Sequence, residues 1–359
     1  MNFTDISSLR LASQQIAGTN FRKAGEIVSW MGAMQAQDLN MAKWAVGIRL
    51  PGSTEETIEA AMNKSEIFRT HVMRPTWHFV SADDIYWMLE LTAPQIKAIL
   101  KGRDKDLGIT ENDYEKSHTQ IEKVLKGGKD LSRDELVIEL EDAGIATGNF
   151  RISHFLLRAE IDGLVCSGTT KGSQQTYALL RERVPKPKSI TREDALARLA
   201  KKYFSSHCPA TLQDFAWWSG LTITESKKAL EMVKSDFVSD TICNETYWFF
   251  NSYSFVGTEK ESAFMLPAYD EFIISYKDRK ACLPYKNHTK AVSSNGVFRP
   301  VIVINGQVTG IWNRTVKKDK VVIETHFFSL TNKATKNMTE EAFLPYGNFL
   351  NKKVEIVFK

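Results

Sequence analysis

The sequence predicts an α+β protein in which three tandem winged-helix units are followed by a small β-barrel. Two observations support this fold class. A pattern of helices followed by two short strands recurs three times, and after about residue 255 the chain changes to a series of strands. The 359 residues, of which 43% are hydrophobic and 25% charged, are enough for several buried cores. We expect four domains, and their ranges are 1–100, 101–184, 185–254 and 255–359.

The first unit combines helices with a hairpin. Apolar residues recur at helical spacing in three segments, which are 6–16, 24–34 and 53–62. A capping box formed by Ser53 and Glu56 begins the last of these. Two strands follow, at 67–73 and 77–80. Arg74-Pro75 forms the turn between them, because proline fixes its own φ and disfavours helix in the residue before it. Ser81 and Asp84 then cap a further helix.

The second unit carries a helix-turn-helix and a wing. Ser132 and Glu135 cap a helix to Ala143, and a second helix over 152–162 ends at Gly163, a residue suited to a helix C-terminus. Strands at 164–167 and 176–180 flank the polar loop GTTKGSQQ. The loop is therefore expected to be a hairpin wing, and its Lys171 is a candidate for DNA contact.

The third unit begins after a linker that contains Pro185 and Pro187. Its expected helices start at Thr191, Thr211 and Thr224, and the last of them has the register of a recognition helix. Its wing strands are expected at 237–242 and 246–250.

The β-barrel is expected to contain five strands, which are 264–276, 298–305, 307–313, 320–328 and 353–358. Asn305-Gly306 favours a hairpin turn, and a helix that starts near residue 339 interrupts the series. Asp270 and Glu271 are neighbours in the first strand and therefore point to opposite faces. We expect a structural ion pair with Lys277 or Arg279 rather than a paired-carboxylate site.

Charge is distributed unevenly, although the net charge is only +4. Residues 181–202 contain eight Lys or Arg against three Asp or Glu, and residues 277–290 contain five against one. Lys186 and Lys188, in the first of these segments, are candidates for phosphate contact. For either segment alone, a solvated surface is the simpler interpretation.

Several classes of protein are disfavoured by what the sequence lacks. No apolar run reaches the length of a membrane span, and the N-terminus does not resemble a signal peptide, so a soluble cytoplasmic protein is expected. The four cysteines have no CxxC spacing, so we expect buried thiols, no disulfide framework and no metal site. The absence of a GxxxxGK[ST] loop argues against a nucleotide-driven motor.

The segment Gln35-Ala36-Gln37-Asp38 is the candidate for chemistry. If the preceding helix ends near Met34, extended backbone would point both glutamines to one face, where their amides could hold a water or a base edge. Alternatively, one glutamine caps a helix and the other is solvated. Asp38 is a candidate general base, but a capping role fits it at least as well.

The expected hairpin after the first helices places four polar or aromatic residues near this segment. His71 and Arg74 are candidates for DNA contact, and a structural role is an equally good interpretation of both. Trp77 is better interpreted as a core aromatic residue. His78 follows it on the same strand.

Over nearly its whole length, the chain resembles the AlkZ-like family of winged-helix DNA glycosylases. The matching stretches, in order, are LRLASQQ (9–15), GAMQAQD (32–38), WAVGIR (44–49), RTHVMRPTWHFV (69–80), LTAP (91–94), DFAWWSGLT (214–222) and LPAYDEFIISYKDR (266–279). The family's signature is Gln, an apolar residue, then Gln or Asp. Gln35-Ala36-Gln37 matches its double-glutamine form.

The resemblance implies three winged-helix domains and a C-terminal β-barrel in a C-shaped molecule around duplex DNA. It also implies monofunctional hydrolysis of the N-glycosidic bonds of N7-alkylated purines, and some family members unhook interstrand crosslinks. Gln35 and Gln37 would then be catalytic. The expected partner is duplex DNA with alkylated purines, and a monomer with no cofactor is expected.

Two other classes of function stay open at this stage. A non-catalytic winged-helix transcriptional regulator would bind DNA with sequence preference, as a dimer on paired half-sites, and would release no base. The chain shows no evident coiled coil or ligand domain, which disfavours a regulator. A scaffold that binds another protein through its wings would lack salt-sensitive DNA affinity.

Overall fold

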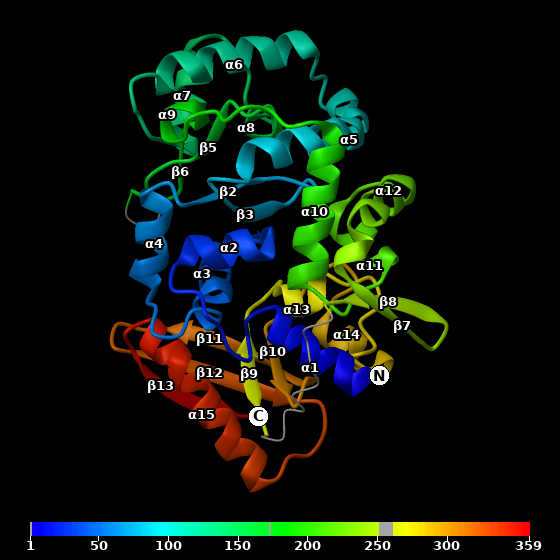
Figure 1. The fold of residues 1–359 in the computed structure, drawn as a ribbon. Coiled ribbons are helices and arrows are strands. Elements are labelled where there is room, and N and C mark those ends of the chain that lie inside the picture. The colour runs from blue at the N-terminus through cyan, green and yellow to red at the C-terminus, as the bar shows by residue number, and fades with distance from the viewer. Residues whose placement is uncertain (1, 172–173, 251–260) are drawn as a thin grey trace.

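The computed structural model describes residues 2–171, 174–250 and 261–359. Figure 1 shows the second unit at the top and the C-terminal sheet at the bottom, with the first unit between them and the third unit at one side. Among the described helices, including the 22-residue α5, none is both long and apolar enough to cross a membrane.

The first unit places the Gln35 segment at the edge of a small sheet. Its elements are α1 (Phe3–Ser13), α2 (Ala24–Met31), β1 (Ala33–Gln35), α3 (Leu39–Ile48), α4 (Glu55–Asn63), β2 (Ile67–His71), β3 (Trp77–Ser81) and α5 (Ile85–Asp106). The strands pair antiparallel in the order β1-β3-β2. Strand β1 was not predicted. Gly32, with φ of +78°, ends α2 at Met31 rather than at the expected Met34.

Three details of the first unit differ from the sequence prediction. The cap of α4 is Thr54, which forms a box with Thr57, and not Ser53 with Glu56. Helix α1 packs partly outside its expected unit, because its Leu11, and Ile16 just after it, join the apolar cluster of the C-terminal sheet. Asp84 precedes α5 as expected but makes no side-chain cap there; its carboxylate accepts from Ser81 and Trp87 instead.

The second unit has the predicted order of helix pair and hairpin. Its elements are α6 (Glu111–Leu125), β4 (Leu131–Ser132), α7 (Arg133–Asp142), α8 (Arg151–Ile161), β5 (Val165–Ser167), β6 (Thr176–Leu179) and α9 (Leu180–Arg183). Ser132 and Glu135 form the predicted capping box of α7. Strand β4 was not predicted, and it completes an antiparallel sheet in the order β4-β6-β5.

The third unit consists of three helices and a two-stranded hairpin. Its elements are α10 (Arg192–Ser206), α11 (Leu212–Ser219), α12 (Ile223–Val233), the 3-10 turn η1 (Lys234–Asp236), β7 (Val238–Ile242) and β8 (Glu245–Phe249). The predicted caps at Thr191 and Thr211 are present. Cys243 lies in the hairpin turn and is exposed, so the prediction that all four thiols are buried was wrong for this one.

The C-terminal region forms an open sheet. Its strands are β9 (Ala263–Leu266), β10 (Val301–Ile304), β11 (Gln307–Val316), β12 (Lys320–Phe327) and β13 (Lys353–Phe358). They pair in the order β13-β12-β11-β10-β9, and no pairing of β9 with β13 closes a barrel among the described strands. The turn at Asn305-Gly306 is as predicted.

The same region contains helical segments between these strands. They are α13 (Glu271–Ile274), η2 (Tyr285–Asn287), α14 (His288–Ala291) and α15 (Lys333–Phe349). The predicted strand over 264–276 was wrong beyond Leu266. Pro267 cannot donate a ladder hydrogen bond, and Asp270 caps the short helix α13. This helix carries Glu271 into the interior beneath the Gln35 segment.

The hydrophobic cores join units that are distant in the sequence. One core packs Phe68 and Met88 of the first unit with Leu199 and Trp218 of the third. Another joins the first unit to the C-terminal sheet and α15, through Trp44, Trp312, Phe343 and Tyr346. The Gln35 segment lies where these elements meet, so its geometry depends on side chains from across the chain.

Candidate active site

The two glutamines differ in exposure. Gln35 ends β1 and only 5% of its surface is exposed, whereas Gln37 is exposed. Ala36, between them, is fully buried in the core, as the sequence predicts. Gln35 is therefore much less accessible than Gln37, and the expectation that both amides face the DNA stays a prediction.

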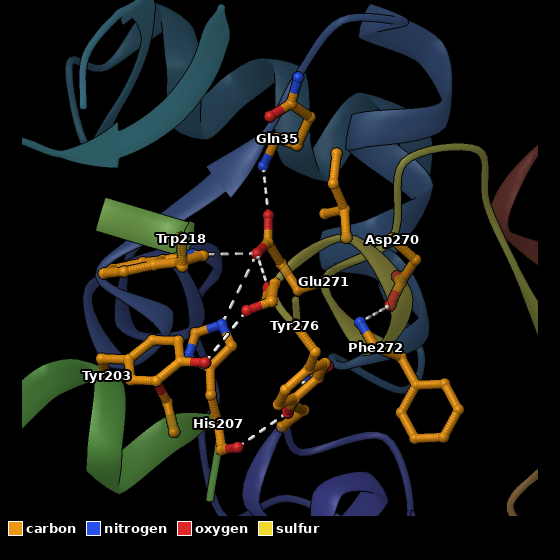
Figure 2. A network of polar contacts seen from close by, with 12 residues as sticks. Gln35, Tyr203, His207, Trp218, Asp270, Glu271, Phe272 and Tyr276 are labelled. Atoms are coloured by element: carbon orange, nitrogen blue, oxygen red, sulfur yellow. Dashed lines mark hydrogen bonds and ion pairs between the residues drawn. The ribbon is translucent and has the colours of Figure 1, made fainter. Parts of the chain in front are cut away.

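The side chain of Gln35 is oriented by the loop between β2 and β3. Its Oε1 accepts a hydrogen bond from Arg74 at 3.2 Å and a longer one from Thr76 at 3.4 Å. Among the described residues, its Nε2 has no hydrogen-bond acceptor. Figure 2 shows the carboxamide pointing away from Glu271, on the side opposite its own backbone nitrogen.

Arg74 also belongs to an aromatic and cationic surface. Its guanidinium lies 5.9 Å from the ring centroid of Trp217, and that of Arg279 lies 5.4 Å from the same ring. Burial lowers the pKa of Arg74, while the negative charge of Glu271 acts in the opposite direction. Arg74 is thus a half-buried cation that contacts Gln35 and borders the exposed Trp217.

Asp38 caps a helix, which was one of its two predicted roles; the other was that of a general base. Its Oδ1 accepts the backbone N–H of Met41 at 3.0 Å, and the residue is the N-cap of α3. This bond fixes where the chain turns from the Gln35 segment into a helix.

The backbone of Gln35-Ala36-Gln37 is held by three partners. The N–H of Gln35 donates to Glu271 Oε1 at 2.5 Å, and the N–H of Ala36 donates to the Trp77 carbonyl at 2.7 Å. Arg69 donates from Nε to the Ala36 carbonyl at 2.9 Å, and from its guanidinium to the Gln37 carbonyl at 3.4 Å. These hydrogen bonds restrict the backbone conformation of the segment.

Glu271 is the centre of a buried polar network (Figure 2). Its Oε2 accepts from Trp218 Nε1 at 3.2 Å and from the hydroxyl of Ser275, and lies 3.6 Å from His207 Nε2. Burial favours the protonated form, but the contact with His207 and the hydrogen bonds from Ser275 and Gln35 outweigh it and lower the pKa of Glu271 to about 2. The carboxylate is therefore charged beneath the candidate site at neutral pH.

Asp270 forms an ion pair that differs from the predicted one. Its two oxygens accept from Arg49 at 2.8 and 2.9 Å, with both side chains buried. The expected partners Lys277 and Arg279 were wrong, because α13 turns Asp270 toward α3 and α1. The prediction that Asp270 and Glu271 form no paired-carboxylate site agrees with their separate partners.

His71 is buried, which favours a structural role over DNA contact. Its Nδ1 contacts the carboxylate of the fully buried Glu160, and its ring packs 4.0 Å from the ring of Trp77. His78 is buried as well and donates from Nδ1 to the Thr76 carbonyl at 2.9 Å. Burial, and then the charge of Arg74, lower the pKa of His78 to about 3, so it is neutral at physiological pH.

The three candidate lysines lie on the surface, away from these contacts. Lys171 lies 3.0 Å from Glu135, and Lys186 lies 3.1 Å from Glu90. Lys188 is exposed, and no ion pair with another described residue involves it. In the described parts of the chain, no three His, Cys, Asp or Glu side chains are grouped so as to hold a metal ion.

Two residues that shape the site, Glu271 and His207, were not predicted to lie there. Glu271 lies 236 positions from Gln35, so no local pattern connects it to the segment. Arg69 was expected on the hairpin strand that lies near the glutamines, but its hydrogen bonds to the Ala36 and Gln37 carbonyls were not predicted. One signal was present for Glu271. Pro267 followed by Asp270 marks the end of a strand and the start of a helix, which would have placed Glu271 in a first helical turn.

Comparison with known proteins identifies the family of the chain. A curated relative from Streptomyces sahachiroi, named interstrand DNA cross-link repair glycosylase, is 22% identical over 368 aligned residues, with 95% of each chain covered. The solved structure of Streptomyces sahachiroi DNA glycosylase AlkZ has the same fold, with a TM-score of 0.81 and 17% identity over 99% of this chain and 100% of that one. The family model described as DNA glycosylase AlkZ-like matches residues 28–349, and the chain therefore belongs to the AlkZ-like family of DNA glycosylases.

Proposed function

We propose that this DNA glycosylase hydrolyses the N-glycosidic bonds of N7-alkylated purines in duplex DNA, with Gln35 and Gln37 as the catalytic residues. The observation that carries the proposal is the rigidly held Gln35-Ala36-Gln37 segment, with one amide exposed and the other oriented by Arg74 and Thr76. Action as a monomer in the cytoplasm belongs to the same proposal.

The chemistry suits neutral amides. An N7-alkylated purine is positively charged, so it leaves as a neutral base when the C1′–N9 bond breaks, and no acid is needed. Water adds its oxygen to C1′ and loses a proton to solvent. Amide oxygens can orient that water and stabilise the positive charge that develops on the sugar.

The two amides would divide this work. Gln37 is exposed and can contact DNA directly. Gln35 is buried, and its Oε1 already accepts hydrogen bonds from Arg74 and Thr76, so its Nε2 is the group left to contact water or sugar. Asp38 is occupied as a helix cap, so the mechanism assigns it no proton transfer.

Binding of duplex DNA would use the winged-helix arrangement of the three units, which would enclose the duplex together with the C-terminal sheet in a C shape. Arg74 is the DNA contact nearest to the chemistry, and Lys171, Lys186 and Lys188 would contact phosphates farther out. Two of these lysines have exposed acidic partners, which phosphates can replace at little cost.

The experiment is base release from duplex DNA that contains N7-methylguanine, detected by strand cleavage at the abasic sites. Gln35→Ala and Gln37→Ala should each slow release by roughly 100-fold, with unchanged DNA affinity. Gln120→Ala, on α6 of the second unit, is the matched control and should behave as wild type.

Two results would defeat the proposal. Wild-type protein that binds DNA tightly but releases no base would favour the transcriptional regulator. Full activity of both glutamine variants would remove the catalytic assignment. A second substrate, a duplex with an N7-linked interstrand crosslink, tests whether interstrand cross-link repair, named for the Streptomyces relative, extends to this chain.

A further inference from the structure

We propose that Glu271 and Arg69 are positioning residues, a two-sided clamp that grips the backbone of the Gln35–Gln37 segment through opposite charges. The proposal rests on the catalytic roles proposed for the two glutamines. Neither clamp residue needs to touch DNA. Their effect on the reaction would come from where they hold the two amides.

The anionic half of the clamp is Glu271. It accepts the backbone N–H of Gln35 at 2.5 Å, while only 2% of its own surface is exposed. Hydrogen bonds to a charged acceptor are about twice as strong as neutral ones, and burial strengthens them further. Figure 2 shows that the carboxylate meets the backbone of Gln35 and not its amide group, so it fixes position without competing for substrate.

The carboxylate itself is held firmly. Trp218 from α11 and Ser275, which follows α13, donate to its second oxygen, and His207 from the end of α10 lies beside it. The first oxygen is thereby left aimed at Gln35. The third unit and the C-terminal region thus meet the catalytic segment through one carboxylate group.

The cationic half is Arg69 on β2. Its guanidinium donates to the carbonyls of Ala36 and Gln37, the next two residues along the segment. The same group stacks 4.1 Å from the ring centroid of Trp77, which fixes its plane. A planar fork can reach two carbonyls and a ring at once, whereas a lysine ammonium cannot.

The signs of the two charges match the polarity of the backbone. The anion takes the N–H at the start of the segment, and the cation takes the carbonyls at its end. Both contacts leave the side chains of Gln35 and Gln37 free of the clamp. A shift of about 1 Å in a reacting group can cost roughly 100-fold in rate, so the clamp acts on the chemical step.

Glu271→Gln and Arg69→Lys test the two halves. The first substitution would keep the side-chain volume but would present an NH₂ group to one of the N–H donors, and the second would keep the charge but lose the fork. Each variant should slow single-turnover release of N7-methylguanine by roughly 10-fold to 100-fold, with the Kd for alkylated duplex within about twofold.

Matched controls lie next to each other in the second unit. Glu182 accepts the backbone N–H groups of Gly127 and Gly128, and Arg183 donates to the carbonyls of Met62 and Asn63. Glu182 and Arg183 thus bind backbone groups, as Glu271 and Arg69 do, but outside the Gln35–Gln37 segment. Glu182→Gln and Arg183→Lys should therefore release the base at the wild-type rate.

Rates are measured per DNA-binding molecule, so that loss of folded protein does not count as loss of catalysis. The Gln35 amide proton should resonate far downfield in wild-type protein and move upfield in Glu271→Gln only. If the clamp variants release the base at the wild-type rate, or if they lose rate and DNA affinity equally, the clamp proposal is wrong. A wild-type protein without base release would instead defeat the proposed function.

Discussion

At the scale of single residues, the site combines neutral groups with buried charges. The two amides are uncharged and His78 is neutral, whereas Glu271 beneath them and Arg74 beside Gln35 carry opposite charges. A cationic substrate would therefore meet a surface that does not have to ionise before the reaction.

The neutral state of His78 predicts a pH dependence of stability. Its pKa in the folded protein, about 3, is below its ordinary value of about 6.5. Below pH 6.5 the unfolded chain therefore binds a proton that the folded chain does not, so acid lowers the free energy of unfolding. Between pH 7 and pH 5 this residue alone should cost about 2 kcal/mol.

His78→Asn tests this, because the asparagine NH₂ can keep the hydrogen bond to the Thr76 carbonyl without titrating. Urea unfolding at pH 7 and pH 5 should show about 2 kcal/mol less change for the variant than for wild type. His207, whose pKa burial also lowers, stays in both proteins, so some acid sensitivity should persist. Equal changes in the two proteins would contradict the assignment.

At the scale of helices and strands, the link between α11 and the loop after β2 sets the position of Arg74. Gly220 ends α11 with φ of +71°, and a Cβ added there would lie 2.9 Å from the Met73 carbonyl and 3.2 Å from Arg74 Cγ. Gly163, after α8, has φ of +70°, but its added Cβ would meet only Leu180, at 4.0 Å.

Gly220→Ala and Gly163→Ala therefore separate backbone strain from collision. Both should lose roughly 1–2 kcal/mol for a left-handed alanine, measured by urea unfolding. Only Gly220→Ala should lose more than that and also slow base release, because the loop that carries Arg74 must shift. Equal losses of stability, with release unchanged in both, would show that this contact does not position the site.

Local chemistry explains which elements the sequence could predict. The capping boxes at Ser132 and Thr211 and the turn at Asn305-Gly306 need only neighbouring residues, and all three are present. The apolar run over 264–276 fits a buried strand or a strand followed by a buried helix equally well, and periodicity alone could not separate them.

The candidate site was predictable only in part for the same reason. The sequence could identify Gln35 and Gln37 and the inward packing of Ala36. It could not give the hydrogen bonds from Arg74 and Thr76 that orient the Gln35 amide, or the role of Glu271, which depends on three units meeting. Long-range pairing has no local signature.

At the scale of the whole molecule, the hydrophobic cores connect some of the units more extensively than others. Two large cores join the first unit to the third unit and to the C-terminal sheet. The second unit has a core of its own, formed by residues between Ile121 and Leu179, and contributes Cys166 and Leu180 to the core that the first and third units share. The Gln35–Gln37 segment belongs to the joined part, so we expect that part to unfold as one body and the second unit to open more independently.

Leu140→Ala and Leu199→Ala test this division, since both leucines are fully buried in helices, one in each part. Each variant should lose roughly 2–5 kcal/mol locally. In hydrogen exchange followed by mass spectrometry, Leu140→Ala should raise exchange mainly between residues 110 and 180. Leu199→Ala should raise it in both the first and third units, because they share one core. Exchange that spreads over the whole chain in Leu140→Ala would mean that the second unit is not separable. The cooperative unit would then include every DNA-binding candidate as well as the Gln35–Gln37 segment.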